Sequence, residues 1–152
     1  MQHINIDGFT LIELMVTILV IAIIAVITMP SFSVMYNRKK LESSVNELVI
    51  QISQARSRAV LIRKTTGVCL DVLSIRDCST AVSINETDQD RIFKVNLDHE
   101  VTAETLSAKS IQFRSNGSIA TSVNFILSRQ ALSYCINVGI TGDTVINEGA
   151  CL

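Results

Sequence analysis

The sequence predicts an α+β protein in which a long N-terminal helix packs on an antiparallel β-sheet domain. Three observations predict this class: an apolar run near the start, a stripe with helical spacing after it, and short alternating segments separated by turn residues. We expect a transmembrane helix over 9–29, an amphipathic continuation over 30–66 and a β-rich domain over 67–152.

The apolar run is long enough to span a bilayer. Between Phe9 and Met29, 17 of 21 residues are apolar, and at about 1.5 Å per residue such a helix is roughly 30 Å long, the thickness of the hydrocarbon core. Glu13 interrupts the run, although a carboxylate inside a bilayer costs about 2.5–3.5 kcal/mol. This carboxylate either stays solvated near the membrane interface or meets a cation when the protein assembles.

The segment after Pro30 keeps a helical period but becomes amphipathic. Its apolar residues are spaced alternately by four and three positions: Leu41, Val45, Leu48, Ile52, Ala55, Ala59 and Ile62. This spacing is typical of one helix face. Because it covers barely three heptads before the β-rich region, packing on a sheet is favoured over a coiled coil. Gly67 suits the left-handed cap that would end the helix.

Charge is divided unevenly along the chain. Residues 38–64 hold seven bases and two acids, whereas residues 65–152 hold six bases and ten acids. The basic stretch would form a solvated helix face, contact anionic lipid headgroups, or dock against the acidic domain of a neighbouring subunit.

Short alternating segments fill the second half of the chain. The candidate strands are Val68–Ile75, Ala81–Ile84, Ile92–Leu97, Ser110–Arg114, Ser118–Leu127, Leu132–Val138 and Thr144–Ile146. The turn Ser115-Asn116-Gly117 predicts a β-hairpin between the strands on either side of it.

A nine-residue signature lies at the start of the apolar run: Gly8-Phe9-Thr10-Leu11-Ile12-Glu13-Leu14-Met15-Val16. It resembles the prepilin signature of type IV pilins and type II secretion pseudopilins. The resemblance implies that a prepilin peptidase removes leader 1–8 by cutting between Gly8 and Phe9 and methylates the new amine of Phe9. It also implies that Glu13 neutralises this amine, in its own or a neighbouring subunit, and that Pro30 bends the helix. An amine and a carboxylate that are each costly in lipid become tolerable as a pair.

Three later segments extend the resemblance over almost the whole chain. They are Gln54-Ala55-Arg56-Ser57-Arg58-Ala59-Val60, Ile111-Gln112-Phe113-Arg114-Ser115-Asn116-Gly117, and a closing strand–glycine–strand that ends in cysteine. Their order is similar to that in the GspH/FimT family of minor pilins and pseudopilins, whose fold is a long N-terminal helix on a β-sheet domain. The resemblance implies three partners: other pilin or pseudopilin subunits, the prepilin peptidase and the inner-membrane assembly platform.

Two cues disagree about orientation in the membrane. The leader has no Lys or Arg whereas Arg38-Lys39-Lys40 follow the apolar run, so the positive-inside rule alone would place the large domain in the cytoplasm. The prepilin signature and the cysteines instead favour a single-pass protein of the bacterial inner membrane whose globular domain is periplasmic or is carried into a cell-surface filament.

Four cysteines lie in the β-rich region: Cys69, Cys78, Cys135 and Cys151. None forms a CxxC pair and no histidine lies close in sequence, so we expect no metal site. In an oxidising compartment they would form disulfides in one of three pairings, of which we favour Cys69–Cys78 with Cys135–Cys151. The alternative is four reduced thiols in a cytoplasmic domain.

An enzymatic role has little support. His99 lies in a polar, turn-like stretch, no serine occupies a nucleophile elbow, and the sequence contains no glycine-rich phosphate loop. We therefore expect a structural subunit with no catalytic residue and no cofactor, assembling into or priming a type IV pilus or a type II secretion pseudopilus.

DNA binding is the alternative function, since the resemblance includes FimT minor pilins that bind DNA during natural transformation through a C-terminal motif of glycine and arginines. The matching segment here is Thr141-Gly142-Asp143-Thr144-Val145. Asp143 stands where a cation is expected, and an acid opposes contact with phosphates. Arg56, Arg58 and Arg63 on the helix remain candidates for contact with nucleic acid or with a protein partner.

Overall fold

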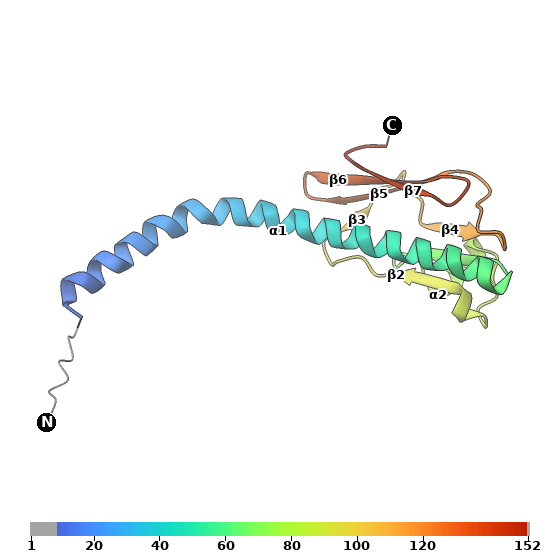
Figure 1. Cartoon of the computed structure of the whole chain (residues 1–152), viewed down its shortest axis with the longest axis horizontal. Coiled ribbons are helices and arrows are strands. Elements are labelled where there is room, and N and C mark those ends of the chain that lie inside the picture. Colours follow the sequence, from blue (N-terminus) through green and yellow to red (C-terminus); the bar gives the residue numbers. More distant parts are fainter. Residues whose placement is uncertain (1–8, 152) are drawn as a thin grey trace, which may run out of the picture. The chain divides into compact units, whose positions relative to one another are not determined.

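The computed structural model describes residues 9–151 and, within them, every side chain except those of residues 27–31. The expected leader 1–8, with Gly8, lies outside the described residues, and so does the side chain of Pro30. The chain divides into two compact units, the first ending at Tyr36 and the second beginning at Asn37 (Figure 1).

One long helix is shared by the two units. Helix α1 runs from Leu11 to Ile62. Every large apolar side chain described between Phe9 and Val26 is at least 46% exposed. In the part of the chain whose side chains are described, no helix combines the length and apolar character needed to cross a membrane.

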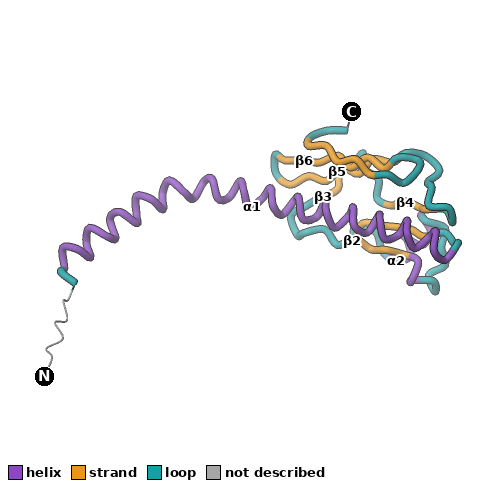
Figure 2. Tube along the Cα trace, viewed as in Figure 1, coloured by secondary structure: helices purple, strands orange, loops and turns teal. Residues whose placement is uncertain are grey.

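The second unit contains two small sheets and two short helices. In chain order its elements after α1 are β1 (Thr66–Leu70), α2 (Ile75–Ala81), the 3-10 helix η1 (Gln89–Arg91), β2 (Ile92–Val95), β3 (Thr102–Ala103), β4 (Ser110–Phe113), β5 (Val123–Arg129), β6 (Leu132–Val138) and β7 (Thr144–Glu148). One sheet has the order β2-β1-β4 and the other the order β3-β5-β6-β7. Figure 2 distinguishes the strands, in orange, from the helices, in purple. All ladders are antiparallel except that between β1 and β2, which is parallel.

The core forms where the second half of α1 meets both sheets. Its helical stripe is fully buried or nearly so: Leu41, Val45, Leu48, Ile52, Ala55 and Ala59. The same cluster includes Val68 from β1, Phe113 from β4 and Phe125 from β5. The predicted packing of the stripe on β-structure is therefore confirmed, because one face of α1 fills the space that both sheets leave open.

The strand predicted over Ala81–Ile84 is wrong, because α2 occupies the preceding residues. Ser74 caps this helix: its Oγ accepts a hydrogen bond from the backbone N–H of Asp77 at 3.1 Å. A serine followed three residues later by an acid is a capping signature. Val82 and Ile84, which suggested strand alternation, are buried in the turn that follows the helix.

The hairpin predicted at Ser115-Asn116-Gly117 is also wrong in its pairing, although the turn forms. Gly117 has φ +80° and its N–H donates to the carbonyl of Arg114 at 2.8 Å. Strand β4 nevertheless pairs with β1, and the chain then crosses to the other sheet to form β5. A local turn signal cannot specify this choice, because the pairing partner of β4 is more than forty residues away in sequence.

The end of α1 differs from the prediction as well. The left-handed residue is Arg63, with φ +52°, whereas Gly67 lies inside β1. A Cβ atom at Gly67 would lie 2.6 Å from the Cβ of Val82. Gly67 is therefore needed for the close approach of β1 to the turn after α2, not for a helix cap.

Candidate assembly site

Helix α1 begins at Leu11, two residues after Phe9. The hydroxyl of Thr10 accepts a hydrogen bond from the N–H of Glu13 at 3.3 Å, and the carbonyl of Thr10 accepts one from Leu14 at 3.2 Å. Thr10 thus caps the helix, and Glu13 is the acidic residue of the first turn. This is the T-x-x-E arrangement of a capping box, in which a carboxylate near the positive end of the helix dipole is stabilised.

The surroundings of Glu13 are apolar and exposed. Phe9 is 84% exposed and Leu11 is 77% exposed. Glu13 forms no ion pair with any of the residues described. An exposed apolar surface with one carboxylate at its start is suited to contact with lipid or with other apolar helices, and the carboxylate is available to one cationic group.

A polar cluster connects α1 to β5 at the start of the second unit. The side chain of Arg129 is 4% exposed, and its guanidinium donates hydrogen bonds to Asn37 Oδ1 at 3.1 Å, Asp98 Oδ1 at 3.0 Å and Glu100 Oε2 at 2.5 Å. Lys40 Nζ donates to Asp98 Oδ2 at 2.7 Å. We name these five residues the Arg129 cluster. It lowers the pKa of the Asp98 carboxyl, first through the hydrogen bond from Lys40 and then through Arg129.

A second group of charges joins α1 to β6 and β7. Arg38 donates to Glu42 at 3.1 Å and to Glu148 at 2.9 Å, and Lys39 donates to Glu42 at 2.8 Å. The hydroxyl of Tyr134 donates to Glu42 at 3.4 Å. The hydrogen bonds from Lys39 and Arg38 lower the pKa of the Glu42 carboxyl.

These contacts show ion pairs within the chain for the first bases of the amphipathic segment, which the sequence analysis did not predict. Arg38, Lys39 and Lys40 all pair with acids of their own chain. The acidic second half of the chain therefore neutralises part of its own helix. Pairing within one chain lowers the net charge that this segment offers to lipid headgroups or to a neighbouring subunit.

The three helix arginines proposed for partner contact do not share one set of neighbours. Arg56 Nη1 approaches the carbonyl of Gly142 at 3.5 Å, and Arg58 Nη2 lies 3.7 Å from a carboxylate oxygen of Asp90. Arg63 follows the last turn of α1 and forms no ion pair with the described residues. The structure therefore does not gather the three into one free cationic site.

The loop 141–145, which the sequence resemblance relates to the DNA-binding motif of FimT minor pilins, lies against Arg56. Gly142 has φ +82°, and a Cβ atom there would meet the carbonyl oxygen of Gly117 at 2.8 Å and Arg56 Cδ at 2.9 Å. The hydroxyl of Thr141 donates a hydrogen bond to Asp143 and lowers the pKa of its carboxyl, to which the charge of Arg56 adds. A stabilised carboxylate beside the nearest arginine opposes binding of a polyanion at this loop.

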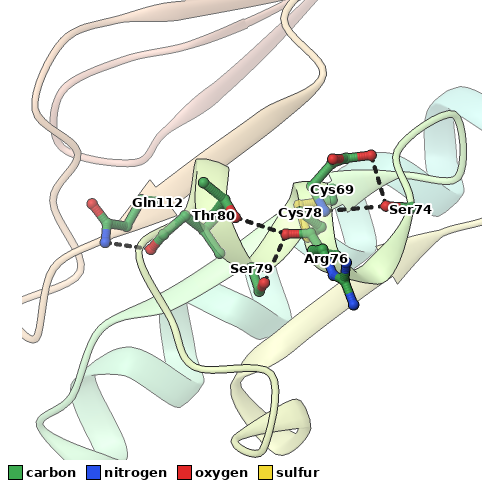
Figure 3. The surroundings of a disulfide bond; sticks show 9 residues. Cys69, Ser74, Arg76, Cys78, Ser79, Thr80 and Gln112 are labelled. Atoms are coloured by element: carbon green, nitrogen blue, oxygen red, sulfur yellow. Dashed lines mark hydrogen bonds between the residues drawn. A yellow bond between two sulfur atoms is a disulfide. The ribbon is translucent and has the colours of Figure 1, made fainter.

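Both expected disulfides are present. Cys69 pairs with Cys78, joining β1 to α2, and Cys135 pairs with Cys151, joining β6 to the segment after β7. Figure 3 shows the first bond beside Arg76, whose carbonyl accepts hydrogen bonds from the hydroxyls of Ser79 and Thr80 at 2.8 and 2.9 Å. The favoured pairing is confirmed, so the alternative of four reduced thiols is wrong.

Sequence reasoning missed the Arg129 cluster. Arg129 was not among the candidate residues, and its three partners come from two segments distant from it in sequence. The available signal was an arginine at the end of an alternating strand, at a position where alternation places the side chain on the buried face. A buried arginine requires acidic partners, which sequence distance alone cannot identify.

Comparison with known families supplies the decisive observation. Residues 5–29 match the family described as prokaryotic N-terminal methylation motif, and residues 44–142 match the family described as type II transport protein GspH. The chain belongs to the GspH family. No curated protein and no solved structure matches it.

The two family matches cover different parts of the structure. The methylation motif covers Phe9, Thr10 and Glu13, at the capped start of α1. The GspH match runs from Ser44 in α1 to Gly142 and covers every strand of the two sheets except β7. A GspH-family chain with a prepilin-type N-terminus is a subunit of the pilin or pseudopilin kind.

Proposed function

We propose that this GspH-family chain is a minor pilin or pseudopilin, held in the bacterial inner membrane by residues 9–29 with its second unit in the periplasm. From there it is extracted into a filament or into the tip that primes one. The observation that carries the proposal is an apolar helical segment inside the methylation-motif match over residues 5–29, with Glu13 as the single charged residue between Phe9 and Arg38. The GspH match favours a type II secretion pseudopilus over a pilus.

The physical reason concerns the carboxylate of Glu13. In lipid it costs about 2.5–3.5 kcal/mol when it has no partner. Cleavage after Gly8 creates an ammonium group at Phe9, four residues away in sequence, which pairs with this carboxylate in the same or a neighbouring subunit. The exposed apolar side chains of α1 then pack against other helices in the filament core. Two disulfides in the second unit agree with an oxidising periplasm.

Mass spectrometry of the mature N-terminus tests the processing step. We expect native protein to begin at Phe9 with one added methyl group on the amine. A purified native chain that still carries residues 1–8 would contradict the proposal.

Substitution of the acid tests the assembly step. We expect Glu13→Ala and Glu13→Val to impair incorporation into the filament, because the amine of Phe9 then lacks its partner. The matched control is Glu47→Ala, which removes an acid from the middle of α1 whose side chain accepts a hydrogen bond from Gln51. Normal incorporation of both Glu13 variants, with the disulfides intact, would count against the pairing.

A further inference from the structure

A single leucine protrudes from the second unit between β3 and β4. Leu106 is 88% exposed, more than any other large apolar side chain described. It lies in a tight turn in which the N–H of Ser107 donates to the carbonyl of Glu104 at 3.0 Å, so Glu104 and Leu106 belong to the same protrusion. The carboxylate of Glu104 forms no ion pair or hydrogen bond with the residues described.

A small apolar pocket lies on another part of the same unit, between α2, η1 and β2. Its volume is about 140 Å³, and its lining residues are Ile75, Cys78, Gln89, Ile92 and Lys94. Lys94 is the only charged residue of the lining, and its ammonium group pairs with none of the described side chains. The pocket is therefore an apolar hollow with one free cation at its edge.

The two features are complementary in apolar character and in charge. An aliphatic side chain beside a free acid matches an apolar hollow beside a free base, which is the anchor-and-rim arrangement of protein interfaces. We propose that Leu106 of one copy inserts into the pocket of a second copy of this chain, where Glu104 pairs with Lys94. In one chain the Glu104 and Lys94 side chains do not pair.

This contact rests on the proposed assembly function and adds a partner to it. Because protrusion and pocket are different surfaces, the contact between the two copies is heterologous. One leucine and one ion pair bind weakly in solution. Helices that already lie side by side in lipid or in a filament hold the two surfaces at high effective concentration, so a weak contact is enough to set the relative position of two subunits.

Charge reversal gives a sharp test on the full chain in lipid vesicles. Self-association is measured by energy transfer between labelled copies of wild type, Lys94→Glu and Glu104→Lys. We expect each single variant to associate more weakly than wild type, by about threefold or more, because like charges then meet at the pocket edge. An equimolar mixture of the two variants recovers association, because each protrusion then meets a pocket of opposite charge.

Two further substitutions separate the apolar anchor from general surface effects. Leu106→Ser should weaken association by about tenfold or more, since the pocket loses its apolar occupant. Lys64→Glu is the matched control for Lys94→Glu: it makes the same charge change at an exposed lysine after the end of α1, and should leave association unchanged.

The outcomes distinguish this contact from the proposed function. Wild-type association in both charge variants, or no recovery in the mixture, overturns the contact, while correct cleavage and incorporation would leave the assembly function standing. If the variants of the protrusion lose filament incorporation but self-associate normally, the protrusion binds a different subunit. This result would also overturn the contact between two copies. An unprocessed N-terminus would instead contradict the assembly function itself.

Discussion

Replacing Arg129 by methionine should destabilise the second unit by about 2–4 kcal/mol. Its side chain is 4% exposed, and among the described residues its guanidinium donates three hydrogen bonds, two of them to carboxylates. Hydrogen bonds to charged groups contribute about 1.5–3 kcal/mol each, but the loss is smaller than their sum. Asp98 keeps Lys40, and Glu100, whose side chain is 60% exposed, regains water.

Methionine keeps an unbranched stem of similar length, so the change removes the charge and the donors more than the packing. The free energy of unfolding is measured on the full chain in detergent by denaturation followed by circular dichroism, because the sequence contains no tryptophan. Amide hydrogen exchange should show the loss of protection first in residues 37–44 and 96–101, the segments that Arg129 joins to β5.

Arg76→Met is the matched control. Arg76 is 84% exposed and pairs with Glu86 at 3.4 Å, and an exposed pair of this kind contributes about 0–1 kcal/mol. If the two methionine variants have the same free energy of unfolding, the Arg129 cluster contributes no more than a surface ion pair, and the reasoning is refuted.

Three other predictions concern the same unit. Replacing Cys135 and Cys151 by alanine should cost about 3 kcal/mol of unfolding free energy, from a closed loop with a sequence separation of 16, and an unchanged denaturation midpoint would contradict this. Because the pKa of Asp98 is lowered on folding, its contribution to the free energy of unfolding is complete above its unfolded pKa of about 3.9 and is lost as the pH falls through the folded value. Asp98→Asn should therefore make stability depend less on pH in the acid range. An acid range identical to that of wild type would contradict this. Gly67→Ala should lower the free energy of unfolding by about 1–3 kcal/mol, since the new methyl group would lie 2.6 Å from Val82. Thermal denaturation at the wild-type temperature would show that the neighbouring residues move apart without cost.

The sequence anticipated those elements whose signal is local. The stripe from Leu41 to Ala59 is buried as its spacing predicted, and β6 has the predicted bounds Leu132–Val138. The disulfide pairing that the sequence favoured among three possibilities is also the one present. In each case the evidence lies within a few turns or one loop of chain.

The predictions that failed depend on partners distant in the chain. The turn at Gly117 forms as expected. However, β4 pairs with β1, and the strand that follows the turn belongs to the other sheet. In the sequence, Gly67 is placed as a helix cap would be. In the folded protein it lies against Val82, the residue that follows α2. Backbone preference is a property of a few residues, whereas a close approach is a property of the whole packing.

By itself the sequence determined where an apolar helix begins, which of its residues carries the lone acid, and which face of its continuation would be buried. These are properties of composition and period, which need no folded partner. Only the tertiary structure decided that Arg129 meets Asp98 and Glu100, and that Leu106 stays outside while Ile75 and Lys94 border a hollow. Such neighbours arise from how strands are ordered in two sheets, and many strand orders are compatible with the same alternating pattern.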